Sequence, residues 1–237
     1  RVTYDYMERY LIEGNFGYNG SENFPPGQKY GFFPSVSAGW VVSKEDFLKD
    51  TRWLNEFKLR ASTGINGSNN IGSYAQYATL GTYNYSIGGA VAIGQGAASI
   101  PNPSLHWEES KSIDFGLDFG FIKNRLTGTF ELYRKNNSEL LLRVPVPGDS
   151  GFQTYLTNIG EVQNQGWEFE LNSLNVKTPS FEWRTSANIS HNENKVLALG
   201  TDQSKIEISN AYDGGVPFVK LEVGKPMYTI FGLKQNG

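Results

Sequence analysis

The stretch SIDFGLDFGF, from Ser112 to Phe121, decides the fold class of this chain. Every second residue from Ile113 onward is a large apolar side chain, and the residues between them are aspartate or glycine. Successive side chains of a β-strand point to opposite faces. The stretch therefore predicts a ten-residue strand with one fully apolar face and one polar face.

A second strand follows directly after a short turn at Lys123 and Asn124, which predicts a β-hairpin. Its apolar face carries Leu126, Phe130 and Leu132, and its other face carries Thr127, Thr129, Glu131 and Tyr133.

The same alternation recurs along most of the chain and predicts seven strands, with an eighth near the end. The other expected strands are Tyr10–Tyr18, Ser35–Val42, Phe57–Ile65, Gly166–Asn172, Phe181–Ser190 and, as the eighth, Tyr228–Leu233. Between two of them, Ser43 with Asp46 resembles the start of a capped helix, so Ser43–Leu54 is either a short helix or a structured turn.

Composition excludes several classes of protein. With 5 Trp, 13 Tyr and 15 Phe but only 19% charged residues, the chain has too much aromatic surface to stay disordered. The absence of cysteine excludes disulfide scaffolds and thiolate metal sites, and a net charge of −3 argues against nucleic-acid binding. No apolar run reaches the roughly 18 to 20 residues of a membrane-spanning helix, which leaves β-barrels open, since their strands alternate.

The connections between strands differ sharply in length. Lys123–Asn124 and Asn175–Pro179 are short, whereas Asn66–Glu109, Asn136–Leu156 and Val196–Val223 are long. Outer-membrane barrels have short periplasmic turns and long external loops. The asymmetry favours an antiparallel transmembrane β-barrel.

Two features bear on the choice between this barrel and a soluble extracellular β-sandwich that binds carbohydrate. The expected strands are longer than is usual in soluble sheets. Aromatic residues near the strand ends, Tyr133, Trp167 and Trp183, fit the girdles of a membrane barrel. The alternation alone permits the sandwich, because its apolar faces would point inward.

Five blocks carry a resemblance to a known family. They are FFPSVSAGWVVSKEDF (32–47), LNEFKLRASTGINGSNNI (54–71), NPSLHWEESKSIDFGLDFGFIKNRLTGTFELYRKN (102–136), NIGEVQNQGWEFELN (158–172) and GKPMYTIFG (224–232). Together they resemble the C-terminal half of the barrel in the SusC/RagA family of TonB-linked outer-membrane transporters of Bacteroidota.

The resemblance implies a 22-stranded barrel in the bacterial outer membrane, of which residues 1–237 would form seven or eight strands. It also implies an N-terminal plug domain, a TonB box and a SusD-like surface lipoprotein, none of which we expect this chain to encode. The implied activity is uptake of glycans or peptides, powered through TonB, by a protein in contact with outer-membrane lipid.

In this interpretation the polar strand faces line the barrel lumen. The expected lumen-facing residues are Asp114, Asp118, Glu131, Glu168, Glu170 and Arg184. Lys44–Asn55 and the short turns would lie on the periplasmic side, and the long connections outside the cell.

The first long connection holds the best candidates for ligand contact, the tyrosines Tyr74, Tyr77, Tyr83 and Tyr85. Amphipathic rings stack on sugar faces and offer rigid contact area. The alternative is that these rings pack against neighbouring loops or the lipoprotein.

Three patterns could suggest a serine nucleophile, a metal site or a pair of catalytic carboxylates, but each is better explained by a structural role. Gly148–Gly151 (GDSG) fits a turn, His106 beside Glu108 and Glu109 fits a loop-base histidine, and Glu168 with Glu170 fits a hydrated strand face. We therefore expect no catalytic residue, no metal site and no cofactor.

Overall fold

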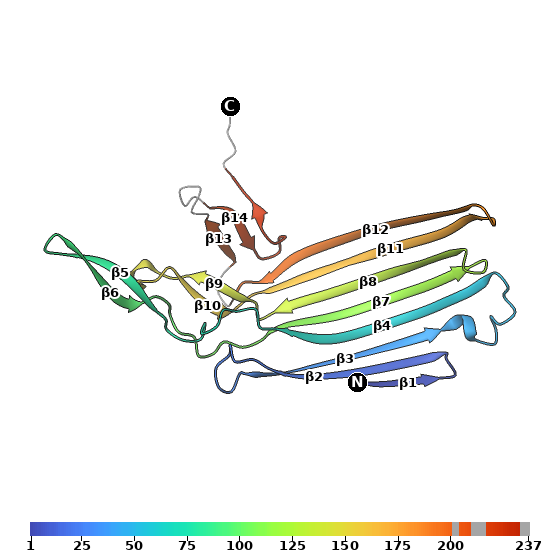
Figure 1. Cartoon of the computed structure of the whole chain (residues 1–237), viewed down its shortest axis with the longest axis horizontal. Helices are drawn as coiled ribbons and strands as arrows, with labels where there is room; N and C mark the ends of the chain where they lie inside the picture. Colours follow the sequence, from blue (N-terminus) through green and yellow to red (C-terminus); the bar gives the residue numbers. More distant parts are fainter. Residues whose placement is uncertain (201–203, 210–216, 233–237) are drawn as a thin grey trace, which may run out of the picture.

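A computed structural model describes residues 1–200, 204–209 and 217–232, and its main feature is one eight-stranded antiparallel sheet (Figure 1). The strand order follows the chain apart from two inserted hairpins. The strands are β1 (Val2–Tyr6), β2 (Tyr10–Gly20), β3 (Tyr30–Val41), β4 (Leu54–Ser68), β7 (Glu108–Phe121), β8 (Leu126–Ser138), β11 (Glu161–Lys177) and β12 (Glu182–Ala198).

Small sheets occupy the long connections, and all of them lie at one end of the main sheet (Figure 1). They are β5 (Leu80–Ile87) with β6 (Ala90–Ala97), β9 (Leu141–Pro145) with β10 (Thr154–Asn158), and β13 (Lys205–Ser209) with β14 (Pro217–Glu222) and β15 (Thr229–Ile230). We call this end the hairpin end and the opposite end, with its short turns, the turn end. Part of Val196–Val223 falls outside the described residues.

Among the residues that the structure describes, two short 3-10 helices lie between strands, η1 (Val42–Lys44) and η2 (Gly148–Ser150). In the described part of the chain no helix is long and apolar enough to cross a membrane.

The expected all-β antiparallel sheet is confirmed, with one correction. The eighth strand of the main sheet is β1, because the last segment contributes only the two-residue β15 to a separate sheet; Leu233 lies outside the described residues. Of the two alternatives for Ser43–Leu54, the structure forms the structured turn: η1 has no side-chain cap, and Asp46 accepts a hydrogen bond from Arg9 (3.1 Å).

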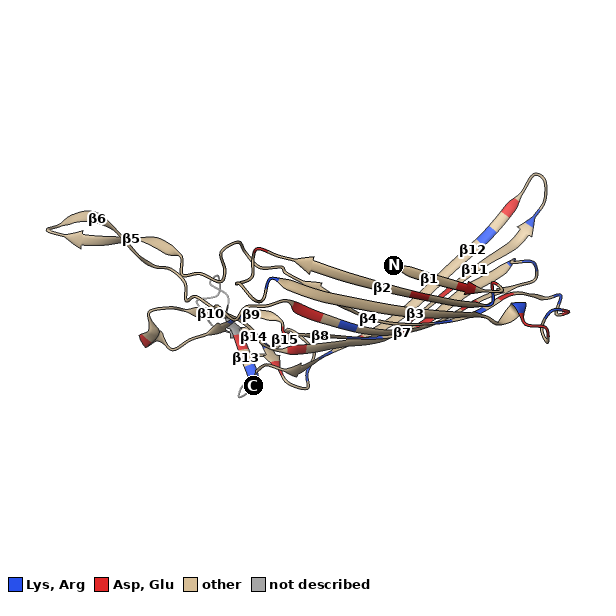
Figure 2. Cartoon of the chain, turned by 90° about the horizontal axis from the view of Figure 1, so that it is seen from below, with Lys and Arg blue, Asp and Glu red and all other residues tan. Residues whose placement is uncertain are grey.

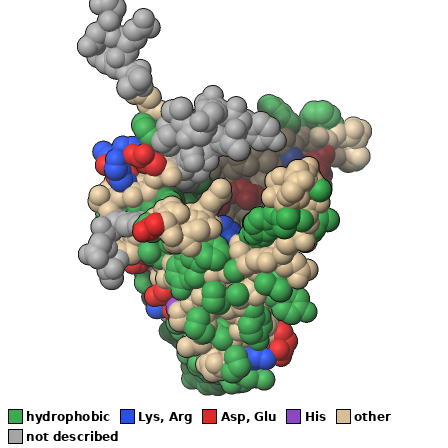
Figure 3. Space-filling model, turned by 90° about the vertical axis from the view of Figure 1, so that its left-hand side faces the viewer, with side chains coloured by type: hydrophobic (Ala, Val, Ile, Leu, Met, Phe, Trp, Pro, Cys, Tyr) green, Lys and Arg blue, Asp and Glu red, His purple; other side chains and the backbone are tan. Residues whose placement is uncertain are grey.

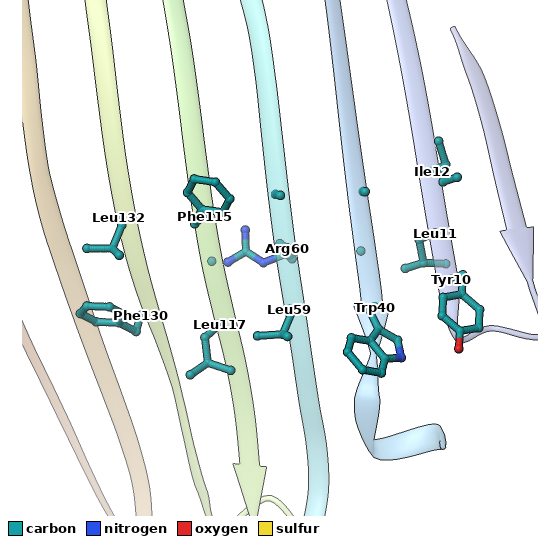
Figure 4. Close-up of a pocket in the computed structure, with 14 residues that line it drawn as sticks. Tyr10, Leu11, Ile12, Trp40, Leu59, Arg60, Phe115, Leu117, Phe130 and Leu132 are labelled. Atoms are coloured by element: carbon teal, nitrogen blue, oxygen red, sulfur yellow. The ribbon is translucent and has the colours of Figure 1, made fainter. Parts of the chain in front are cut away.

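The register places most of the large apolar residues of the strands on one face, although Leu11, in the row of Arg60, lies on the other. Leu117 of β7 lies opposite Leu59 of β4 and Phe130 of β8. The row continues through Phe169 and Ile189 on one side and through Trp40 and Tyr10 on the other. Figure 4 shows five members of this row side by side, from Tyr10 to Phe130.

This apolar face is uncovered, which excludes the two packed sheets of a sandwich. Phe115 and Ile189 are 57% and 58% exposed, and the other sheets, of two or three strands, belong to the connections at the hairpin end. Trp167 and Trp183 lie on the apolar face, whereas Tyr133 does not. The assignment of Tyr133 to an aromatic girdle is wrong, because it pairs with Asp114 on the polar face and donates a hydrogen bond to Asn192 Oδ1 (2.9 Å).

Charged residues hold the turn end together. Glu45 accepts hydrogen bonds from the Tyr10 hydroxyl (2.7 Å) and from Trp40 Nε1 (2.9 Å), and it pairs with Arg9 (3.2 Å). Lys44 pairs with Glu8 beside it. The hydrogen bonds from Tyr10 and Trp40, with the charge of Arg9, hold the pKa of Glu45 below its ordinary value. The connection after β3 is thereby tied to the turn between β1 and β2.

The assignment of faces predicts the effect of one charge placed in the centre of the apolar row. Leu117→Arg in the whole protein should destabilise the folded barrel in a bilayer by about 2 to 4 kcal/mol, because the guanidinium would meet lipid near the midplane. Denaturant titration of the protein in lipid vesicles measures this change.

Thr129→Arg is the matched control, since Thr129 lies on the polar face between Asp118 and Glu170. It should cost little. If Thr129→Arg were the costly variant and Leu117→Arg the neutral one, the two faces would have to be exchanged.

Candidate functional site

The polar face of the sheet is centred on a three-residue charge cluster. Arg60 of β4 donates two hydrogen bonds to Asp118 of β7, from Nε (2.8 Å) and Nη2 (2.9 Å), and a third from Nη2 to Glu131 of β8 (2.7 Å). A guanidinium can serve two carboxylates in this way because its donors form a planar fork. The cluster therefore links three adjacent strands.

A glycine makes room for this arrangement. Gly116 lies in the same row as Arg60 and Glu131, on the strand between them. A Cβ on Gly116 would come within 2.8 Å of the Arg60 guanidinium. The Arg60 side chain thus lies over Gly116, where β7 has no side chain, and Figure 4 shows it extending from β4 toward that strand.

All six expected lumen residues share this polar face, although only some of them interact. Asp118 and Glu131 meet through Arg60, and Asp114 accepts a hydrogen bond from Ser62 (3.3 Å). Glu168 lies directly opposite Glu131.

Arg184 and Glu170 interact with near neighbours on their own strands. Arg184 does not pair with Glu168 or Glu170; it pairs with Glu182 on its own strand (2.5 Å), and Glu170 accepts a hydrogen bond from Asn172 (2.7 Å). A β-bulge between Leu174 and Val176 lies opposite this part of β12. The acids of β11 therefore have no cationic partner in the described part of the chain.

The four candidate tyrosines do not form one cluster. Tyr83 and Tyr85 lie on one face of the β5–β6 hairpin, two residues apart. Tyr74 and Tyr77 belong to the turn before that hairpin, where Tyr74 has a positive φ of 67°. All four are exposed, from 41% for Tyr83 to 70% for Tyr74.

The hairpin tyrosines lie over the opposite strand of the hairpin. A Cβ on Gly94 would come within 2.5 Å of the Tyr85 ring, and the Tyr83 hydroxyl donates to the carbonyl of Ala97 (3.0 Å). The glycines of β6 therefore let the rings lie flat against the backbone. The hairpin presents two fixed, exposed aromatic surfaces.

The hairpin end is almost free of charge around these rings. No Asp, Glu, Lys or Arg occurs from Ala61 to Trp107. Figure 2 shows the β5–β6 hairpin without a charged residue, projecting beyond the sheet. Figure 3 views the molecule from this end, where hydrophobic and uncharged side chains make up most of the described surface.

Two asparagine side chains, one of them buried, hold the connections at this end in place. Asn158 donates to the carbonyl of His106 (2.8 Å) and accepts from its backbone N–H (3.0 Å). Asn102, only 1% exposed, donates to the carbonyl of Leu156 (2.9 Å). The β4–β7 and β8–β11 connections are thereby joined.

An indole completes the contact with a third connection. Trp107 Nε1 donates to the carbonyl of Lys29 (3.1 Å), and its ring packs against Phe24 (5.2 Å between centroids). The three connections form a supported platform rather than independent loops.

The residues with possible chemistry are separately engaged. His106 Nε2 lies 3.3 Å from Glu139 and not beside Glu108, while Ser150 Oγ accepts from the backbone N–H of Phe152 (3.2 Å) within the turn around η2. Among the described residues no group of three or more metal-ligating side chains gathers.

Sequence reasoning identified the acids and missed the arginine that joins two of them. Arg60 stands in an alternating stretch, LNEFKLRAS, that predicts its face but not its neighbours. The register across β4, β7 and β8 brings the three groups together, so only strand pairing reveals the cluster.

The cluster predicts a specific energetic coupling. Arg60→Gln should destabilise the whole protein by about 1 to 2 kcal/mol, because it leaves Asp118 and Glu131 without their shared cation. Gly116→Val should have a similar effect by displacing the guanidinium. Unfolding measurements on both single variants and the double variant form a double-mutant cycle.

The two losses should not add, with a coupling of about 1 kcal/mol, because each variant disrupts the same contact. Gly64→Ala would be a poor control, since its Cβ meets backbone atoms; Ser190→Ala on the same face, remote from Arg60, is the better one. Full additivity of Arg60→Gln and Gly116→Val would contradict the cluster.

Comparison with known proteins identifies the family in which this architecture occurs. Residues 2–222 match the family described as "TonB dependent receptor-like, beta-barrel". The chain is 36% identical over 84% of its length to TonB-dependent receptor P26 of Formosa agariphila, and 36% identical over 86% of its length to TonB-dependent receptor SusC of Bacteroides thetaiotaomicron. It covers 20% and 21% of those proteins.

Solved structures agree with the sequence relatives. The structure of the RagAB peptide transporter superimposes with a TM-score of 0.84 at 25% identity, covering 95% of this chain and 24% of that chain. The eight strands are accordingly part of a larger barrel in the bacterial outer membrane, within a family of receptors and transporters rather than of enzymes. The chain belongs to the TonB-dependent receptor family and forms part of its β-barrel domain.

Proposed function

We propose that the protein containing this chain imports a glycan or a peptide across the outer membrane, with energy from TonB and with a SusD-like lipoprotein at the surface. The chain spans about a fifth of the curated relatives it matches, so this activity belongs to the whole protein. Residues 1–237 supply part of the barrel wall and three external connections.

The observation that carries the proposal is the division of one sheet into an apolar and a charged face, with an aromatic, uncharged hairpin at one end. The apolar face suits lipid, and the charged face suits a wet lumen. Cargo would meet the hairpin tyrosines first and then pass along the face that carries Arg60, Asp118, Glu131 and the acids of β11.

Two substrate classes remain in the proposal for different reasons. Exposed, rigid tyrosine rings fit the faces of sugars, which favours a glycan. One structural relative is described as a peptide transporter, which favours a peptide. Neither class requires bond cleavage by this segment, and we assign no catalytic role to Ser150, Glu168 or Glu170.

The proposed orientation places the hairpin end outside the cell. Two exposed serines make a matched pair for testing it: Ser86 in β5, near the hairpin tip, and Ser180 at the turn end. Because the chain has no cysteine, Ser86→Cys and Ser180→Cys each introduce a single thiol into it. A thiol reagent that cannot cross the outer membrane should label Ser86→Cys in intact cells and spare Ser180→Cys.

The unsubstituted protein is the blank, and permeabilised cells should label both variants. Labelling of Ser180→Cys alone in intact cells would invert the orientation.

Uptake measurements test the activity. Cells expressing the whole protein should accumulate at least one member of a panel of fluorescent oligosaccharides and peptides, and deletion of TonB should abolish this uptake. Tyr85→Ala should weaken surface binding of that probe by about twofold to tenfold, the value of one aromatic contact.

Thr82→Ala, on the opposite face of the same hairpin, is the matched control and should bind normally. Ser150→Ala and Glu168→Gln should leave uptake intact. Hydrolysis of a probe that stopped with Glu168→Gln would replace the transporter proposal by an enzymatic one.

A further inference from the structure

Two grooves on the apolar face meet near the hairpin end, and both are lined by Ile113 and Arg134. The first also contains Phe115, Leu132, Trp167 and His191. The second also contains Phe16, Val36, Ile65 and Lys111. Arg134 therefore stands where the two grooves join.

The register fixes the height of this arginine. Arg134 lies opposite Ile113 and Gln165, one step beyond the row formed by Phe115, Leu132 and Trp167. Below that row the face is apolar as far as Phe121 and Leu126. Above it come polar residues such as Asn136 and Gln163. Arg134 thus marks the edge of the apolar band, where lipid headgroups lie.

Arg134 differs from three other charged residues on this face, and only Lys195, opposite Gln163 on β12, likewise lacks an ion pair among the described residues. Lys111 pairs with Glu109 (3.0 Å), Glu161 accepts a hydrogen bond from Asn136 (3.4 Å), and Glu193 accepts one from Gln165 (3.5 Å). Arg134 has no ion pair with any described residue, and its side chain is exposed. An unpaired guanidinium at this height suits an anion supplied by the membrane itself.

We propose that Arg134 binds the phosphate of an outer-leaflet lipid whose acyl chains lie along the apolar rows below it, in the first groove. The placement in the outer leaflet rests on the orientation proposed above. A guanidinium matches two phosphate oxygens with parallel N–H donors, and basic residues beside apolar membrane surface attract anionic headgroups. Lys111 sits diagonally across from Arg134 and adds positive charge on the same side.

The site at Arg134 differs from ordinary contact with lipid in its chemistry. Apolar rows hold any acyl chain, whereas the junction at Arg134 selects a lipid by its phosphate. The second groove lies level with Arg134 and beyond it, beside Lys111 and Asn136, where the headgroup would lie.

Native mass spectrometry of the whole protein, purified in mild detergent and mixed with lipid A, tests the site. We expect a bound lipid A whose occupancy falls about fivefold in Arg134→Gln, the effect of one basic residue near a lipid surface. Lipid A dephosphorylated by phosphatase should bind the unsubstituted protein as weakly as intact lipid A binds the variant.

Lys135→Gln is the matched control, because Lys135 is the next residue of β8 and lies on the opposite face. It should retain the lipid fully. Lys111→Gln should show a smaller loss than Arg134→Gln and gives a second reading if Arg134→Gln fails the heat-shift assay for a folded barrel.

Equal occupancy in Arg134→Gln, Lys111→Gln and the control, or equal binding of dephosphorylated lipid A, would overturn the proposal. Retention of an inner-leaflet phospholipid in preference to lipid A would overturn the outer-leaflet assignment. Uptake of cargo is a separate readout that Arg134→Gln should leave unchanged, so failure of the lipid site and failure of the transport proposal can be told apart.

Discussion

Continuous antiparallel pairing is the constraint on which the rest of this structure depends. The main-sheet strands from β2 to β12 are 11 to 17 residues long, and their pairing has three register shifts, two between β11 and β12 and one between β4 and β7. Because side chains alternate along each strand, this pairing aligns the apolar sides of the seven strands into one face of the sheet and their polar sides into the other. In a bilayer the same pairing satisfies the backbone groups that lipid cannot. A slip of one residue would turn an apolar strand face toward water.

The polar face shows how the sheet accommodates charge within a membrane domain. Arg60 reaches two acids on two other strands because Gly116 leaves the space between them free. The acids of β11 have no such cation among the described residues. The charges around Arg60 are therefore paired within the barrel wall. The carboxylates of Glu168 and Glu170 are left to interact with other parts of the whole protein or with its cargo.

The two ends of the sheet are built from different interactions. At the turn end, charged groups around Glu45 join neighbouring connections. At the hairpin end, asparagine side chains join the β4–β7 and β8–β11 connections, and the Trp107 indole joins them to the β2–β3 connection. The uncharged, aromatic β5–β6 hairpin suits recognition by stacking and shape, which agrees with the proposed capture of cargo at this end.

The sequence by itself determined the period-two faces, the antiparallel class and the difference between short and long connections, because alternation and turn composition are local properties. It placed Ile113 and Leu117 on one face and Asp114 and Asp118 on the other. Only the tertiary structure decided which residues meet. Arg60 with Glu131 and Asn158 with His106 lie far apart in the chain. The place of β1 as the eighth strand of the main sheet likewise depends on pairing. Contacts between distant strands follow from register, and register is a property of the assembled sheet.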